Sequence, residues 1–234
     1  MHPHGNYLPN DKMCDLICEN YTLLQVLSRF ELPLGFGEKT VEEVCRENGV
    51  DCSTFLSVVN FILDGCTQMA EDPGQISVPS LMAYLQQSHH YFLDFYLPFI
   101  RRKLIEAIDC SSENKIAYLI LRFYDEYVGE VRKHMDYEDE NVFTYVEALL
   151  SGQRSEHYRI STFARRHGAI DAKLTELKNI IIKYYPEKEK NLLLNAVLQD
   201  IFSCEQELSS HCKVEDLLFI PAVTELERKE NETK

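Results

Sequence analysis

Two pairs of histidine and glutamate, each spaced four residues apart, interrupt runs that otherwise have the apolar pattern of buried helices. His134 and Glu138 form the first pair, and His211 and Glu215 form the second. Residues four apart share one face of an α-helix, so both side chains of a pair reach the same point. Each pair falls on the apolar stripe of its helix. The chain must therefore fold so that two ionisable pairs enter a helical core.

An internal repeat links these pairs to two further histidines. His90, His134 and Glu138 are each followed, 77 residues later, by a residue of the same type. These later residues are His167, His211 and Glu215. The offset selects His90 over its neighbour His89, because it carries His89 to Arg166. The residues predicted to converge on one core site are His90, His134, Glu138, His167, His211 and Glu215.

Metal coordination explains why these residue types recur in a core. A buried carboxylate without a partner costs several kcal/mol or shifts its pKa, and two facing carboxylates are worse unless cations lie between them. Neutral imidazole nitrogen together with carboxylate oxygen suits iron, manganese or zinc. We therefore predict two metal ions bridged by Glu138 and Glu215, with the histidines completing their coordination in an order that the sequence leaves open. The alternative is an unmetallated bundle in which each histidine is an ordinary core residue.

The rest of the pattern predicts an all-α protein. The 234 residues are 45% apolar and include only 9 Gly and 8 Pro, which suits helices better than strands and turns. Short connections between four long helices favour an up-and-down four-helix bundle, preceded by a small three-helix N-terminal domain. The long helices are expected over 80–109, 113–150, 156–184 and 187–228, with a kink at Pro98 in the first. The predicted organisation is a disordered tail over 1–11, a small helical domain over 12–66, a linker over 67–79 and the bundle over 80–229.

Charge and hydropathy exclude several classes of function. The formal net charge of −14 disfavours binding to nucleic acid or to an anionic membrane surface. No apolar run reaches the length of a transmembrane helix, and the N-terminus does not have the pattern of a signal peptide. The eight cysteines form no Cys-x-x-Cys motif, and we interpret them as reduced thiols of a cytoplasmic protein. The oligomeric state is left open, with a homodimer as one option.

Two stretches of the sequence resemble known families. "HCKVEDLLFIP" at the second pair resembles the hemerythrin-like proteins. "LLQVLSRFELPLGFGEKTVEEVCRENGVD" resembles the short domain that precedes the hemerythrin-like bundle in the repair-of-iron-centres family. The resemblance covers residues 12–226 and implies two iron ions with a bridging oxo or hydroxo group, or manganese or zinc in their place. The ligand pattern of that family carries over to all six predicted residues.

The N-terminal stretch departs from that family at one point. The family has a Cys-Cys pair just before a glycine, whereas Gly35 and Phe36 stand there in this chain. Cys45 and Cys52 lie further along and do not form that pair, so a role that depends on those thiols is in doubt. Cys212 adjoins a predicted ligand in sequence, and we expect its side chain to point elsewhere.

The resemblance implies a non-haem di-iron protein of defence against nitrosative and oxidative stress. Such a protein would bind O2 or NO at its di-iron site, or deliver iron, in the repair of damaged iron–sulfur proteins. A second hypothesis is a di-iron sensor of O2, NO or iron that signals to a partner protein, and the altered "LGFGEK" stretch favours it. A third is a helical interaction protein without metal.

Overall fold

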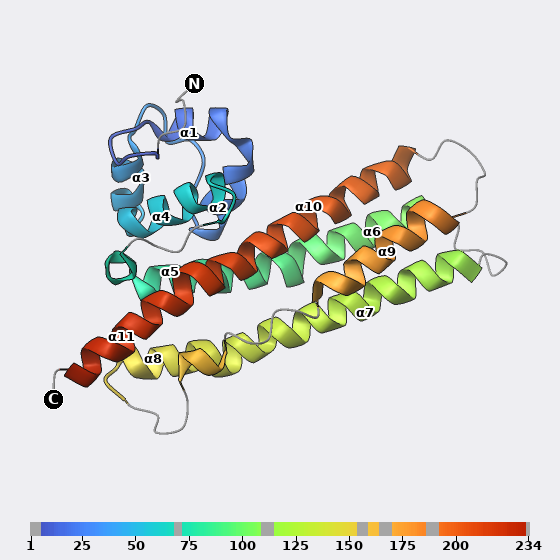
Figure 1. Ribbon diagram of the computed structural model, residues 1–234. Helices are drawn as coiled ribbons and strands as arrows, with labels where there is room; N and C mark the ends of the chain where they lie inside the picture. The colour runs from blue at the N-terminus through green and yellow to red at the C-terminus, as the bar shows by residue number, and fades with distance from the viewer. Residues whose placement is uncertain are drawn as a thin grey trace. The chain divides into compact units, whose positions relative to one another are not determined.

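The computed structural model describes residues 6–67, 72–108, 115–153, 159–163, 170–185 and 192–232 (Figure 1). Within these ranges the chain is helical and contains no β-strand, which confirms the all-α prediction for the described residues. The chain divides into two compact units, residues 1–88 with 210–234 and residues 89–209. No helix of the described part combines the length and apolar character that a membrane crossing requires.

Short helices occupy the N-terminal region, as predicted, but the first of them is divided. The region contains α1 (Met13–Glu19), the 3₁₀ helix η1 (Tyr21–Leu23), α2 (Leu24–Arg29), α3 (Val41–Glu47) and α4 (Cys52–Leu63). Asn20 has a non-helical backbone, φ −138° and ψ 76°, and therefore separates α1 from η1. Thr40 caps α3 through a capping box with Glu43, as its position predicts. Asp51 caps α4, because its carboxylate accepts the Thr54 N–H at 2.8 Å.

Residues 6–11 are not the disordered tail that the sequence predicts. The backbone N–H of Tyr7 donates to Asn60 Oδ1 at 2.8 Å, and its hydroxyl donates to Glu19 at 2.7 Å. Burial, together with the Glu19 carboxylate, raises the pKa of Tyr7 to about 12. The tail prediction missed this because the partners of Tyr7, which are Glu19, Asn20 and Asn60, lie outside the segment and are brought to it by the fold. Residues 1–5 lie outside the described residues.

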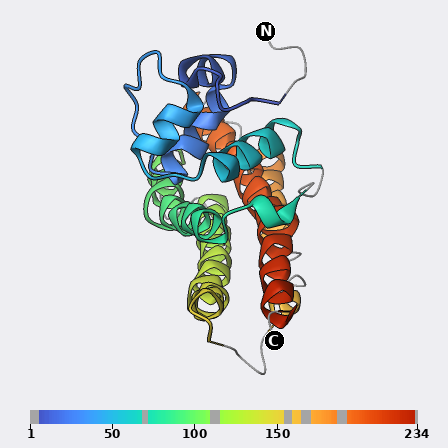
Figure 2. The same ribbon diagram turned by 90° about the vertical axis from the view of Figure 1, so that its left-hand side faces the viewer.

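The second half of the predicted linker is also structured. Asp72 accepts the Gly74 N–H at 3.1 Å at the start of the 3₁₀ helix η2 (Pro73–Gln75). This turn packs beside the C-terminal helix α11 (Ile220–Glu232) (Figure 2). The Ser77 N–H then donates to Thr54 Oγ1 at 2.8 Å, just before the next helix begins. Residues 68–71 of the linker lie outside the described residues.

Long helical segments make up most of the remaining described residues, and three of them contain a π-helical stretch. The first consists of α5 (Val78–His90), π-helix η3 (Tyr91–Tyr96) and α6 (Leu97–Ala107). The second consists of α7 (Lys115–Tyr137), π-helix η4 (Glu138–Phe143) and α8 (Thr144–Leu150). The third is described as the 3₁₀ helix η5 (Ile160–Thr162) and α9 (Ile170–Tyr184), and the fourth as α10 (Leu192–Val214), π-helix η7 (Glu215–Phe219) and α11.

Proline marks the end of two of these π-helical stretches. Pro98 is the second residue of α6, and Pro221 is the second residue of α11. A proline inside a regular α-helix lacks the N–H of the backbone ladder, and its ring clashes with the carbonyl four residues earlier. A wider π turn just before the proline relieves both problems. The distortion expected at Pro98 therefore takes the form of a π-helical stretch.

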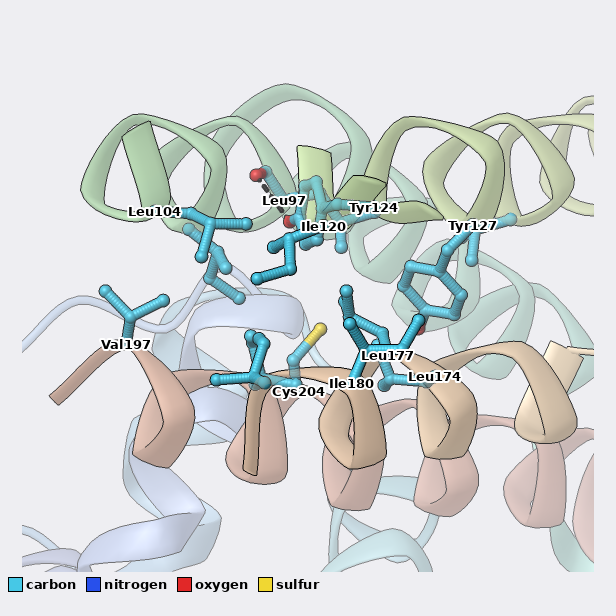
Figure 3. Packing of buried hydrophobic residues seen from close by; sticks show 14 of the residues in the cluster. Leu97, Leu104, Ile120, Tyr124, Tyr127, Leu174, Leu177, Ile180, Val197 and Cys204 are labelled. Carbon is cyan, nitrogen blue, oxygen red and sulfur yellow. Dashed lines mark hydrogen bonds between the residues drawn. The ribbon is translucent and has the colours of Figure 1, made fainter. Parts of the chain in front are cut away.

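One hydrophobic cluster holds the unit of residues 89–209 together (Figure 3). The helices α6, α7, α9 and α10 all contribute to it, and α7 lies along α9. The buried hydroxyl of Tyr124 donates to the Leu97 carbonyl at 2.8 Å, which ties α7 to α6 (Figure 3). The cluster includes Leu104, Ile120, Tyr127, Leu174, Leu177, Ile180, Val197 and Cys204.

Replacing a cluster residue should destabilise the protein far more than replacing an exposed residue of the same helix. Leu177 is fully buried in α9, so we expect Leu177→Ala to lower the free energy of unfolding by about 2–5 kcal/mol through lost burial and a cavity. Ile182, also in α9, is 60% exposed, and Ile182→Ala should change the free energy of unfolding by less than about 1 kcal/mol. Urea denaturation followed by circular dichroism measures both, and equal effects would contradict the assigned core.

Candidate metal centre

Glu138 faces two imidazoles, one with each of its carboxylate oxygens. Its Oε2 lies 3.1 Å from His89 Nε2, and its Oε1 lies 2.8 Å from His134 Nε2. Glu138 is fully buried and His89 is 2% exposed. His134 is the i−4 neighbour of Glu138 at the end of α7, whereas His89 comes from the other side, near the end of α5. The carboxylate therefore links two histidines from different helices.

The ring of His89 is held in one orientation. Its second nitrogen, Nδ1, lies 2.9 Å from an Asp139 carboxylate oxygen, and the ring stacks on Phe143 at a centroid distance of 5.5 Å. An ionised carboxylate only accepts hydrogen bonds, so Nδ1 of the neutral ring carries the proton and Nε2 presents a lone pair to Glu138. Two acceptor atoms 3.1 Å apart require a cation between them, which is either a proton on Nε2 or a metal ion. A carboxylate–imidazole arrangement of this kind is typical of histidines that bind metals.

His211 and Glu215 form a second buried pair. His211 Nε2 lies 3.0 Å from Glu215 Oε1, and the two residues are 0% and 1% exposed. His211 belongs to the last turn of α10, and Glu215 is the first residue of η7. Glu138 has the same place as the first residue of η4. Both His-x3-Glu pairs thus end an α-helix at the point where a π-helical stretch begins.

The donor atoms of these residues form groups that can hold a metal ion. In the unit of residues 89–209, His89 and His134 each present a nitrogen to the carboxylate of Glu138. In the unit of residues 1–88 and 210–234, His211, Cys212 and Glu215 supply a nitrogen, a sulfur and carboxylate oxygens. Imidazole nitrogens and carboxylate oxygens are the donors that iron, manganese and zinc accept in proteins. The chemistry of the residues present therefore fits a metal centre.

Four of the six residues predicted from the sequence belong to these groups, and one does not. The side chain of His90 is 70% exposed and pairs with Asp94 at 3.2 Å, so the structure brings His89 rather than His90 to Glu138. His167 lies outside the described residues, and its role stays a prediction.

The repeat offset selected His90, and the α-helical period read across the π-helical stretch η3 leads to the same residue. A π turn contains an additional residue, so the apolar stripe shifts by one position across η3. Tracing the α-helical period back from Leu97 through Leu93 leads to His90, whereas the buried stripe of α5 runs through Leu85 to His89. Following the buried face of α5 up to the start of η3 therefore leads to His89.

Sequence reasoning also missed two residues near the pairs. Asp139 was not considered, although it orients the His89 ring. Cys212 was expected to point elsewhere, but its sulfur lies within 4.8 Å of a Glu215 carboxylate oxygen. Spacing gives a signal for Cys212, because it precedes Glu215 by three residues and so shares its helix face. No comparable signal exists for Asp139, whose contact depends on the position of another helix.

The helices and the buried donor set together define a metal-binding helical protein. The family model described as the Hemerythrin HHE cation binding domain matches residues 80–223, which is more than half of the chain. The chain therefore belongs to the hemerythrin family. No curated protein and no solved structure gave a significant match.

Replacing His89 and His90 one at a time tests which of the two histidines binds metal. We expect His89→Ala to remove at least one metal ion per chain, because His89 is oriented toward Glu138. His90→Ala, at the neighbouring exposed position, should leave the metal content unchanged. Metal analysis of both purified variants gives the answer. Loss of metal from the His90 variant alone would restore the assignment made from the repeat.

Proposed function

We propose that this protein is a non-haem di-iron protein that defends against nitrosative and oxidative stress and takes part in the repair of iron–sulfur centres. The observation that carries the di-iron part is the placement of Glu138, whose two oxygens face different imidazoles. A carboxylate in this arrangement is suited to bridge two ions, one bound by His89 and the other by His134. Membership of a cation-binding family supports the same proposal.

Each residue of the site has a distinct part in the proposal. His89 and His134 supply nitrogen ligands on either side of Glu138, while His211 and Glu215 supply a nitrogen ligand and a further carboxylate. His167 keeps its predicted place as a ligand. Asp139 holds the proton on His89 Nδ1 and so keeps Nε2 available. When bound, two iron ions supply open coordination positions and electrons for chemistry with O2 or NO.

Burial determines what can reach the site. Glu138, His211 and Glu215 are at most 1% exposed, so bulk water and large substrates have little access. A small diatomic molecule suits such a site better than a peptide or a sugar. The same burial strengthens the interaction between the carboxylates and bound cations, because the surroundings screen charge weakly.

The wider setting of the proposal comes from the resemblance. We place the site in an up-and-down four-helix bundle preceded by the small N-terminal helical domain, in a cytoplasmic protein whose partners are damaged iron–sulfur proteins. The second candidate is a sensor of O2, NO or iron that signals to a partner protein. The observation that favours the sensor is the missing Cys-Cys pair, since Gly35 and Phe36 stand in its place.

Removing the carboxylate of Glu138 should empty part of the centre. We expect Glu138→Ala to lose at least one of about two metal ions per chain, because the variant lacks the group that links the two metal positions. Glu140→Ala is the matched control, since Glu140 is exposed and belongs to the same π-helical stretch. Metal analysis after purification without oxygen measures both. Full retention of metal by the Glu138 variant would exclude a bridging role.

Anaerobic addition of NO separates the two candidate functions. Both predict a new optical spectrum when NO is added to the iron-loaded protein. Only the repair function also predicts that the protein restores activity to a nitrosylated iron–sulfur enzyme, and that the His89→Ala variant does so poorly. NO binding without restored activity would favour the sensor. Purification from iron-replete cells with a metal content near zero would contradict both and support a metal-free interaction protein.

A further inference from the structure

A cysteine lies on the part of α10 that the side chain of Glu215 covers. Side chains of an α-helix lean toward the N-terminus, so each reaches over the residues three and four positions before it. For Glu215, the first residue of η7, these residues are Cys212 and His211 in the last turn of α10. One carboxylate therefore has an imidazole and a thiol on the same side of its helix.

Both groups lie near the Glu215 carboxylate. His211 Nε2 is 3.0 Å from Glu215 Oε1, and the sulfur of Cys212 is within 4.8 Å of a Glu215 carboxylate oxygen. An ion with a sulfur ligand at about 2.3 Å and an oxygen ligand at about 2.1 Å holds these donors less than about 4.4 Å apart, so a small side-chain rotation lets them share one ion. The buried pair of His211 and Glu215, in a chain that belongs to a family of cation-binding domains, is independent evidence for an ion at this place.

We propose that Cys212 is a thiolate ligand of a metal ion bound by Glu215. This inference rests on the metal-binding part of the proposed function and adds a sulfur donor to its nitrogen and oxygen donors. The thiol loses its proton to solvent when the metal–sulfur bond forms, and no electron is transferred. The two buried carboxylates then have different partners, because Glu138 faces two imidazoles whereas Glu215 has one imidazole and one thiolate.

A sulfur donor changes which metal ions the Glu215 position prefers. Thiolate is a soft ligand that favours zinc and iron, whereas carboxylate oxygen also suits manganese. The position at Glu215 should therefore discriminate against manganese more strongly than one built only from nitrogen and oxygen. Cys212 is also partly exposed, whereas Glu215 is 1% exposed, so a reagent in solution can report whether the sulfur is bound.

Cobalt(II) reports the proposed bond directly, because a thiolate bound to cobalt(II) gives an intense near-ultraviolet charge-transfer band that nitrogen and oxygen ligands do not give. We expect this band to develop when the metal-free, full-length protein is titrated with cobalt(II) without oxygen. Cys212→Ala should lose the band but still bind cobalt through the remaining donors. Cys204→Ala is the matched control and should keep the band, since Cys204 lies on the same helix but is buried in the hydrophobic cluster.

Two further measurements make the result independent of any one variant. Competition with a chelator should show that Cys212→Ala binds cobalt(II) at least about tenfold more weakly, with a smaller change for manganese(II). In the natural protein, bound cobalt(II) should slow the alkylation of Cys212, as measured by mass spectrometry of its peptide. Cobalt bound without the charge-transfer band, or a band that persists in folded Cys212→Ala, would overturn the role of Cys212 alone. A natural protein that binds no cobalt would contradict the proposed metal centre as well.

Discussion

A carboxylate enclosed by imidazoles in a helical interior is the constraint on which the whole site depends. Glu138 has no exposed surface, and its two oxygens lie 3.1 and 2.8 Å from imidazole nitrogens. Burying an ionised carboxylate is costly unless cations compensate it. Because Asp139 fixes the proton on the far side of His89, the nitrogen that faces Glu138 offers a lone pair. A metal ion would satisfy both groups at once, and the chain belongs to a family of cation-binding domains.

The π-helical stretches connect the backbone to this chemistry. η4 begins at Glu138 and η7 begins at Glu215, so each carboxylate stands where an α-helix widens. A wider turn redirects the residues that follow it, and such turns occur often at functional sites. In η4 the redirected residues include Asp139 and Phe143, which hold the His89 ring by a hydrogen bond and by stacking. The helix irregularity thus supplies the groups that orient a ligand provided by another helix.

Periodicity predicted an all-helical chain and the two buried His–Glu pairs, and it gives the wrong face where the period itself changes. The ranges of the long helices and the cap at Thr40 follow from local signals that act within a few residues. The pairs at His134 and His211 were visible because residues four apart share a helix face. The repeat offset pointed to His90 rather than His89, and η3 shifts the apolar stripe by one residue, a change that apolar spacing alone does not reveal. The docking of Tyr7 depends on tertiary packing, because its partner Asn60 lies 53 residues further along the chain.

X-ray absorption spectroscopy of the anaerobically purified protein tests the central claim most directly, because it reports the ligands of the bound metal itself. The predicted result is an iron edge with nitrogen and oxygen neighbours, clear imidazole scattering and a second iron atom at short distance. Imidazole scattering should weaken in the His89→Ala protein, where one nitrogen ligand is lost. Iron surrounded only by water and carboxylate oxygens, with no imidazole contribution, would contradict the claim that the buried histidine–glutamate group is the metal site.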